Sequence, residues 1–211
     1  MNKEEFVEEC KKINIFLTPD QLEKLNKFYH LMLEWNQKIN LTRITEEKEV
    51  YLKHFYDSLT LNKVVDLKKI TTLCDVGTGA GFPGIVLKIV FPNIKITLID
   101  SLQKRINYLN EIIKELNLDN IETIHTRGEE YHGKYEVVTS RAVANIEKLT
   151  KYTMHLVSKN GIFVAMKGKI ENELTQEVRK KISKKYKIVK EEKFLLPMEN
   201  SERTLLIIKN K

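Results

Sequence analysis

The chain is 211 residues long, with 42% hydrophobic residues and a formal net charge of +7, which suits one domain with an apolar core and at most a small extension. It contains no run of 18 apolar residues and does not begin with a signal-peptide pattern, so we expect a cytoplasmic protein with no membrane partner. The two cysteines, Cys10 and Cys74, match no metal-binding spacing, which favours reduced thiols and no metal site.

The positive charge is concentrated in the last third of the chain. Residues 1–70 hold 12 basic and 12 acidic side chains, residues 71–149 hold 9 and 10, and residues 150–211 hold 15 and 7. The last segment, which includes Arg179-Lys180-Lys181 and Lys184-Lys185, therefore has a net charge of +8. Such a region attracts phosphates and is consistent with a nucleic-acid partner. The alternative is a solvated helix face, because 30 of the 36 basic residues are lysine.

Residues 1–65 are predicted to form a helical extension that packs on a main domain spanning residues 66–211. Thr18-Pro19-Asp20-Gln21 predicts a helix start, because it combines a threonine cap, a proline in the first turn and a glutamine three residues after the cap. The apolar residues that follow at helical spacing are Leu22, Leu25, Phe28, Tyr29, Met32 and Leu33. The pattern breaks from Asn36 to Thr42, and a further helix is expected over residues 46–61.

From Ile70 onward, apolar strands alternate with helices, which predicts an α/β fold with helices on both faces of a mostly parallel sheet. The expected strands are 71–76, 94–99, 121–125, 135–140, 161–166, 186–193 and 203–209. The expected helices are 83–91, 102–117, 145–158 and 170–184, the second of them capped by Ser101. A turn-rich link joins the last two strands without a helix, so we expect a hairpin at the edge and seven strands with the last one antiparallel.

A glycine-rich turn after the first of these strands predicts a nucleoside cofactor. The turn reads Asp75-Val76-Gly77-Thr78-Gly79-Ala80-Gly81, and the next strand ends in Asp100. Glycines let the backbone approach a ligand closely, and the start of the following helix offers free N–H donors. The carboxylate of Asp100 is placed to reach ribose hydroxyls.

The spacing of this turn separates two classes of cofactor. A dinucleotide site would have its third glycine at the position that Phe82 occupies. The spacing is instead similar to that of the class I S-adenosylmethionine-dependent methyltransferases, which have a Rossmann-like fold. Their sulfonium cofactor suits an acidic strand end such as Asp75. An NAD-dependent oxidoreductase and a glycine turn that only packs are the alternatives.

Two further segments follow strands at the same edge of the predicted sheet, where ligands bind in such folds. Gly128 permits a turn and Glu129 can meet an adenine amino group, with an ordinary acidic loop as the alternative. In Ser140-Arg141-Ala142, the arginine can bind the methionine carboxylate, a phosphate or a base edge. Residues 139–145 lack both the Asn/Asp-Pro-Pro-aromatic segment of amine methylation and the cysteine of pyrimidine-carbon methylation. We therefore expect methylation of a ring nitrogen such as purine N7, by in-line positioning.

Taken together, these motifs identify a family. In chain order they are Asn40-Leu41-Thr42, His54 with Asp57-Ser58, the glycine turn extended by Phe82-Pro83-Gly84, Asp100-Ser101-Leu102 with Lys104-Arg105, and Ser140-Arg141-Ala142. The chain closely resembles, over nearly its whole length, the glucose-inhibited division protein B family of bacterial small-subunit ribosomal RNA (guanine-N7) methyltransferases.

The resemblance implies a cofactor, a substrate and a set of site residues. It implies that S-adenosylmethionine is bound around Gly77, Phe82, Gly128, Glu129 and Arg141. By the general rule for this fold, Asp100 is expected to bind the ribose. Asp75, Gly79 and Gly81 of the glycine turn are further expected cofactor-binding residues. The implied substrate is a guanine in 16S ribosomal RNA, either free or within the small ribosomal subunit, and a monomer is the default expectation.

Some of these residues and the function itself have alternatives. His54 and Asp57 lie three residues apart on a predicted helix and can instead hydrogen-bond the N-terminal helices to the sheet. Lys104 and Arg105 are expected on a solvated helix face. The alternatives to an enzyme acting on 16S ribosomal RNA are a methyltransferase of another RNA or of a small molecule, and a non-catalytic RNA-binding protein with the same fold.

Overall fold

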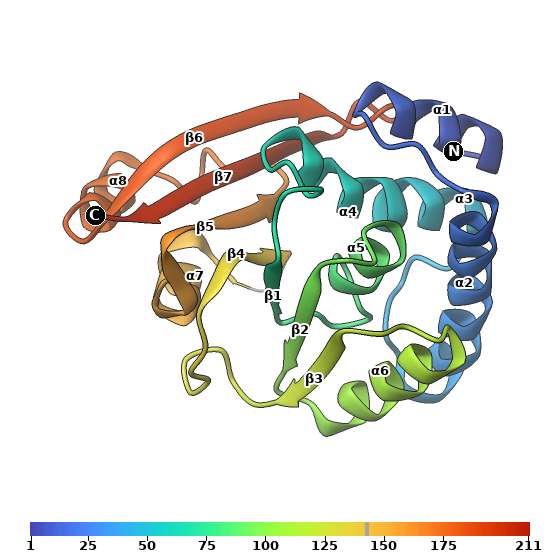
Figure 1. The fold of residues 1–211 in the computed structure, drawn as a ribbon. Helices are drawn as coiled ribbons and strands as arrows, with labels where there is room; N and C mark the ends of the chain where they lie inside the picture. The colour runs from blue at the N-terminus through green and yellow to red at the C-terminus, as the bar shows by residue number, and fades with distance from the viewer. Residues whose placement is uncertain (142–143) are drawn as a thin grey trace.

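The computed structural model describes residues 1–141 and 144–211, so Ala142 of the predicted Ser140-Arg141-Ala142 motif lies outside the described residues. The described residues form one seven-stranded sheet, in which β1 to β5 run parallel and β7 is antiparallel to both of its neighbours (Figure 1). This confirms the predicted fold class. The strands are β1 (Thr72–Val76), β2 (Lys95–Asp100), β3 (Ile121–His125), β4 (Tyr135–Arg141), β5 (Val157–Lys167), β6 (Tyr186–Leu195) and β7 (Glu202–Asn210).

The strand order is β3-β2-β1-β4-β5-β7-β6, so the reversed strand β7 is the inner member of the hairpin at the edge of the sheet. Burial explains this order. Residues 204–208 of β7 are all buried, whereas every residue of β6 is at least partly exposed. A strand that is apolar on both faces is best covered by neighbours on both sides, and a more polar strand tolerates the edge.

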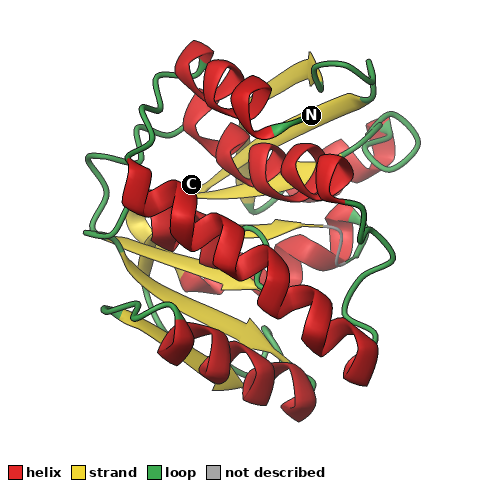
Figure 2. Cartoon of the chain, turned by 90° about the vertical axis from the view of Figure 1, so that its right-hand side faces the viewer, coloured by secondary structure: helices red, strands yellow, loops and turns green. Residues whose placement is uncertain are grey.

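The helices lie in two layers on the sheet. Helices α5 and α6 cover one face, with α2 packed on them from outside, and α7 and α8 cover the other face (Figures 1 and 2). No helix among the described residues has the length and apolar character needed to cross a membrane. The helices are α1 (Lys3–Lys12), α2 (Pro19–Ile39), α3 (Glu47–Val50), the π-helix η1 (Tyr51–Tyr56), α4 (Asp57–Leu59), the 3-10 helix η2 (Thr60–Lys63), α5 (Gly84–Val90), α6 (Gln103–Glu115), α7 (Ile146–Thr153), the 3-10 helix η3 (Met154–Leu156) and α8 (Gln176–Ser183).

Helix α2 begins where the sequence predicts and ends later. The side chain of Thr18 accepts a hydrogen bond from the N–H of Gln21, whose side chain accepts one from the N–H of Thr18. The helix then continues through Asn36 to Ile39 and ends at Asn40, which has a left-handed conformation with φ 50°. The expected break at Asn36 is wrong because a polar stretch can continue a helix along its solvent side.

The predicted cap of α6 is also wrong. Ser101 precedes the capping position, which is held by Leu102. The N–H of Leu102 donates to Oδ1 of Asp100 at 3.0 Å. Asp100 at the end of β2 thus fixes the residue that enters α6, and the helix begins without a side-chain cap.

Two helices of the second half are shorter than expected. The helix expected over 170–184 begins only at Gln176, because the side chain of Thr175 accepts the N–H of Val178 and caps it there. The helix expected over 145–158 ends with η3, because β5 begins at Val157 and pairs with Tyr135 of β4. In both cases a cap or a strand pairing overrides the helical pattern.

The N-terminal helices share one apolar core with the α5 face of the sheet. Phe28 of α2 stacks on Phe55 of η1 with 5.9 Å between ring centroids, and it lies 5.4 Å from Phe82, which follows the glycine turn. Phe28 and Phe55 are fully buried. The division into an extension (residues 1–65) and a main domain (residues 66–211) stays a prediction, and this aromatic cluster offers a way to test it.

We expect Phe28→Ala to lower the free energy of unfolding by about 3–5 kcal/mol, because it leaves a cavity between α2 and the glycine turn. Urea unfolding followed by circular dichroism and by the fluorescence of the single tryptophan, Trp35, should show one shared transition. The control is Phe16→Ala, since Phe16 is 68% exposed and should change stability by less than about 0.5 kcal/mol. Separate transitions for the two signals would contradict a shared core.

Candidate functional site

A cavity of about 370 Å³ lies at the carboxyl ends of β1, β2 and β4, which is within the range of small-molecule sites. The predicted residues that line it are Gly77, Gly79, Phe82, Asp100 and Arg141. Parallel strands place their carboxyl ends at one edge, so the fold brings together residues that are far apart in sequence.

The glycines of the turn have different tasks, although Gly77, Gly79 and Gly81 all have positive φ, at 73°, 60° and 91°. A Cβ on Gly79 would find its nearest neighbour only at 4.0 Å, so this glycine leaves room on the side of the cavity. A Cβ on Gly81 would lie 2.6 Å from Cγ1 of Ile85. Gly81 therefore serves the packing of α5, and Gly79 serves the cavity.

Asp75 holds the glycine turn from beneath. Its side chain is fully buried, and Oδ2 accepts the N–H of Gly84 at 2.9 Å. Burial raises the pKa of Asp75 to about 6, while the neighbouring Thr78 hydroxyl, the Gly84 hydrogen bond and the positive charge of Arg141 oppose the rise. Asp75 supports the loop and is not among the residues that line the 370 Å³ cavity, so its assignment to the cofactor stays a prediction.

Asp100 lines the cavity and ties the end of β2 to the turn. Its Oδ2 accepts the N–H of Gly79 at 2.9 Å and a hydrogen bond from Nη1 of Arg105 at 3.2 Å. The expectation of a solvated helix face is therefore wrong for Arg105, which turns back to the carboxylate and lines the cavity. Lys104, next to it, is exposed as expected.

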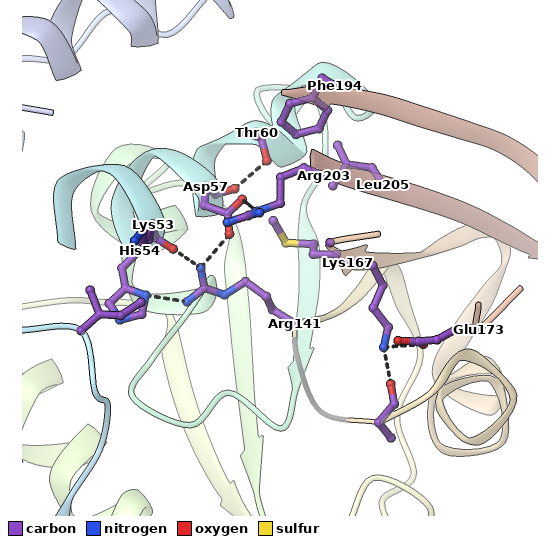
Figure 3. A pocket seen from close by; sticks show the side chains of 14 residues that line it. Lys53, His54, Asp57, Thr60, Arg141, Lys167, Glu173, Phe194, Arg203 and Leu205 are labelled. Carbon is purple, nitrogen blue, oxygen red and sulfur yellow. Dashed lines mark hydrogen bonds and ion pairs between the residues drawn. The ribbon is translucent and has the colours of Figure 1, made fainter. Parts of the chain in front are cut away.

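Arg141 lies at the centre of a polar network between the sheet and the N-terminal helices (Figure 3). Its Nη1 donates to the carbonyl of Lys53 at 2.8 Å and to Oδ2 of Asp57 at 3.1 Å, and its Nη2 bonds Nδ1 of His54 at 3.1 Å. Oδ1 of Asp57 accepts from Nε of Arg203 on β7 at 3.0 Å. His54 and Asp57 thus join the helices to the sheet, which was the structural alternative for this pair.

The hydrogen bonds of His54 define its protonation. Because a guanidinium only donates, Nδ1 must accept from Arg141, and the proton of the neutral ring lies on Nε2. Nε2 then donates to Oγ1 of Thr42 at 3.0 Å. Burial, reinforced by the charge of Arg141, lowers the pKa of His54 to about 3. The neutral ring also stacks on Phe82, with 4.3 Å between centroids.

Gly128 and Glu129 are not among the residues that line the 370 Å³ cavity. Gly128 is buried, and a Cβ on it would lie 2.7 Å from Cγ1 of Val76, so this glycine permits a close approach to β1. Glu129 is exposed. Their assignment to the cofactor stays a prediction.

A second cavity of about 540 Å³, not predicted from the sequence, shares His54 and Arg141 with the first. Its other side chains include Lys167 at the end of β5, Phe194 of β6 and Arg203 of β7. The sequence contains one signal for this cavity: Lys167 is a charged residue at the carboxyl end of an apolar strand.

Comparison with known proteins decides the family. A family model described as rRNA small subunit methyltransferase G matches residues 21–205. The Ribosomal RNA small subunit methyltransferase G of Bacillus pumilus is 44% identical over 218 residues, covering 100% of this chain and 91% of the relative. That of Lactobacillus helveticus is 46% identical, with coverage of 99% and 91%. The chain belongs to this family. The family predicted from the motifs is thereby confirmed.

Solved structures agree with the fold of this family. A SAM dependent methyltransferase from Aquifex aeolicus superimposes with a TM-score of 0.60 at 16% identity, covering 85% of this chain and 97% of that chain. A point mutant of MtNAS in complex with S-adenosylmethionine gives a TM-score of 0.59 at 14% identity, with coverage of 89% and 75%. At these identities the likeness extends to the fold alone.

As a member of this family, the chain is an S-adenosylmethionine-dependent methyltransferase. The cavity fits this cofactor in three respects. Gly79 leaves room beside the backbone of the turn. Oγ1 of Thr78 is buried and belongs to a residue that lines the cavity, and although it neighbours the Asp75 carboxylate it forms no hydrogen bond of good geometry among the described residues. The carboxylate of Asp100 stands beside Gly79, where hydroxyl groups can donate to it.

We expect Gly79→Ala to weaken binding of S-adenosylmethionine at least tenfold, because the added methyl group enters the cavity. The left-handed backbone should also cost about 1–2 kcal/mol of stability. The matched control is Asn117→Ala, at an exposed residue with φ 48°, which carries the same strain outside the site. Titration calorimetry that finds equal cofactor affinity in both variants would exclude Gly79 from the binding surface.

His54 should make stability depend on pH. Its pKa is lower in the folded state, so its contribution is complete above the unfolded value of 6.5 and is lost as the pH falls toward 3. We expect a loss of about 2 kcal/mol between pH 6.5 and 5.

The measurement is the free energy of unfolding by urea at pH 7 and pH 5. We expect the variant His54→Gln to lack the loss of stability that His54 causes in the wild type at the lower pH. Asp75 acts in the opposite direction, because its raised pKa makes its contribution disappear as the pH rises through about 6. Since Asp75 is present in both proteins, the difference between wild type and variant isolates His54. A difference that does not change with pH would contradict a buried, neutral His54.

Proposed function

We propose that this protein transfers the methyl group of S-adenosylmethionine to N7 of a guanine in 16S ribosomal RNA. The observation that carries the proposal is that the cofactor cavity and the second, larger cavity meet at His54 and Arg141, which line both. A cofactor on one side and an extruded nucleotide on the other would face each other across these two side chains. The names of the relatives support ribosomal RNA as the substrate class.

The residues around this junction suit a reaction without proton abstraction. Guanine N7 has a free lone pair and no proton, so the bond from N7 to the methyl carbon forms as the bond from carbon to sulfur breaks. The bound cofactor supplies a methyl group activated by its sulfonium charge. His54 is neutral and hydrogen-bonded at both ring nitrogens, and both oxygens of Asp57 bind arginines. These groups hold the substrate and cofactor in place and take no proton. Catalysis therefore comes from the alignment of the reacting atoms.

The geometry of the glycine turn and of the strand ends beside it supports a set of proposed cofactor contacts. Asp100 takes the ribose hydroxyls, and the backbone from Gly77 to Gly79 faces the methionine part. Gly128 and Glu129 are assigned to the adenine end, supported by the hydrogen bond of 3.2 Å that ties the loop to β2 through Thr126 and Asp100. Toward the residues that the structure describes, Arg141 uses three of its five N–H groups, and we assign the other two to the cofactor carboxylate or to the substrate.

Part of the basic C-terminal segment lines the second cavity, through Lys167 and Arg203, but its lysine pair Lys184-Lys185 is distant from both cavities. Strand pairing places Lys167 of β5 and Lys193 of β6 at one end of the sheet, both opposite Thr204, and Tyr186 at the other end. Lys184 and Lys185 therefore lie about 25 Å along the sheet from the site. We infer that an extended RNA contacts them while its target base enters the second cavity. A monomer suffices, since one chain builds both cavities.

The test is incubation with methyl-labelled S-adenosylmethionine and 16S ribosomal RNA, both free and within the small subunit. We expect label as N7-methylguanosine at one position of 16S ribosomal RNA, and none in 23S ribosomal RNA used as the control. Comparing the two forms of 16S ribosomal RNA identifies the substrate form. Label in a small acceptor but not in RNA would overturn the proposal.

A further inference from the structure

The second cavity combines apolar walls with charged groups at its far side. Met166, Phe194 and Leu205 supply apolar lining, which suits the faces of a flat base. Lys167 and Glu173 lie on the opposite side of Arg141 from His54 (Figure 3). A base in this cavity would therefore have one edge toward the cofactor and another toward Glu173.

Two carboxylates line this cavity, and they differ in what they can still accept. Asp57 binds Arg141 through one oxygen and Arg203 through the other, at 3.1 and 3.0 Å. Glu173 forms an ion pair with Lys167 through Oε2 at 2.8 Å, and its Oε1 has no partner among the described residues. Oε2 is buried, and although it is close to Lys167 it accepts no hydrogen bond of good geometry from any described residue. Within the described part of the chain, Glu173 is thus the lining carboxylate with unused acceptor capacity.

The position of Glu173 is well defined by its surroundings. The side chain of Lys167 is only 9% exposed, and its Nζ donates to the carbonyl of Ala144 while it pairs with Glu173. The backbone N–H of Glu173 donates to the carbonyl of Ile170 at 2.9 Å, in a turn anchored by the buried side chains of Ile170 and Leu174. The carboxylate is therefore held in place before any ligand arrives.

Guanine matches such a carboxylate in a way that leaves N7 free. Its N1–H and N2–H groups are neighbouring donors that point in one direction, and N7 lies on the opposite edge of the base. Adenine has no proton on N1 and no amino group at C2, so it cannot form this pair. Methylation at N7 makes the ring cationic and N1–H more acidic, so a hydrogen bond to a carboxylate strengthens as the transition state develops.

We propose that Glu173 determines specificity for guanine by accepting N1–H and N2–H of the target base, with Lys167 as its positioning residue. The assignment rests on the proposed function and adds the residue that selects the base. It orients N7 toward His54, Arg141 and the cofactor cavity. Because its hydrogen bond to N1–H strengthens as N7 is methylated, Glu173 also stabilises the transition state.

The experiment first maps the target guanine with the wild-type enzyme and then replaces it with inosine, which lacks the N2 amino group, in ligated 16S ribosomal RNA. We expect wild-type kcat/KM to be about 10- to 100-fold higher for guanosine, the effect of one hydrogen bond to a charged group. In Glu173→Gln this ratio should fall below about threefold, because the amide cannot accept both donors. Glu173→Ala should show the same loss of discrimination.

The matched control is Glu171→Gln, which changes an exposed neighbouring glutamate that pairs with Lys193 and should keep the wild-type ratio. Unchanged affinity for S-adenosylmethionine shows that each variant is folded. If the Glu173 variants slow both substrates equally and keep the ratio, the carboxylate is only structural and the assignment is overturned. A wild-type enzyme that does not methylate the RNA at all contradicts the proposed function instead, and this assignment with it.

Discussion

The arrangement of the site depends on the burial of one guanidinium group. Arg141 has a side chain that is only 13% exposed, and a buried charge without partners costs several kcal/mol. Strand β4 delivers the arginine, and the helical segment 47–63 supplies its acceptors: the carbonyl of Lys53, the carboxylate of Asp57 and the ring nitrogen of His54. The need to satisfy this charge ties the N-terminal helices to the sheet where the two cavities meet.

The π-helix η1 makes one of these acceptors available. In a regular α-helix, the N–H of Asp57 would bind the carbonyl of Lys53, four residues back. Here it binds the carbonyls of His54 and Leu52 instead, and the carbonyl of Lys53 accepts from Arg141. π-Helical turns occur often at functional sites. In this protein the turn redirects a backbone carbonyl from the helix to the buried arginine.

Three aspartates near the site have different roles because their environments differ. Asp75 is fully buried beneath the glycine turn, where burial raises its pKa and the Gly84 N–H is its hydrogen-bond donor. Asp100 accepts from Gly79 and Arg105 at the cavity wall. Asp57 pairs with two arginines from different strands. The same side chain thus supports the loop, faces the cofactor cavity or joins elements, according to its surroundings.

The seven strands, the glycine turn and the family could be predicted from sequence because they depend on neighbours along the chain, such as the alternation of apolar segments and the positive φ of Gly79. The structural roles of Asp75 and Arg141, and the second cavity with Glu173, could not. The hydrogen-bond partners of Arg141 lie 84 to 88 residues away, and the cavity is closed by strands from the far end of the chain. Sequence by itself determined which elements form and which cofactor they serve. Only the tertiary structure decided which buried charges pair, because their partners come from segments far apart in the sequence.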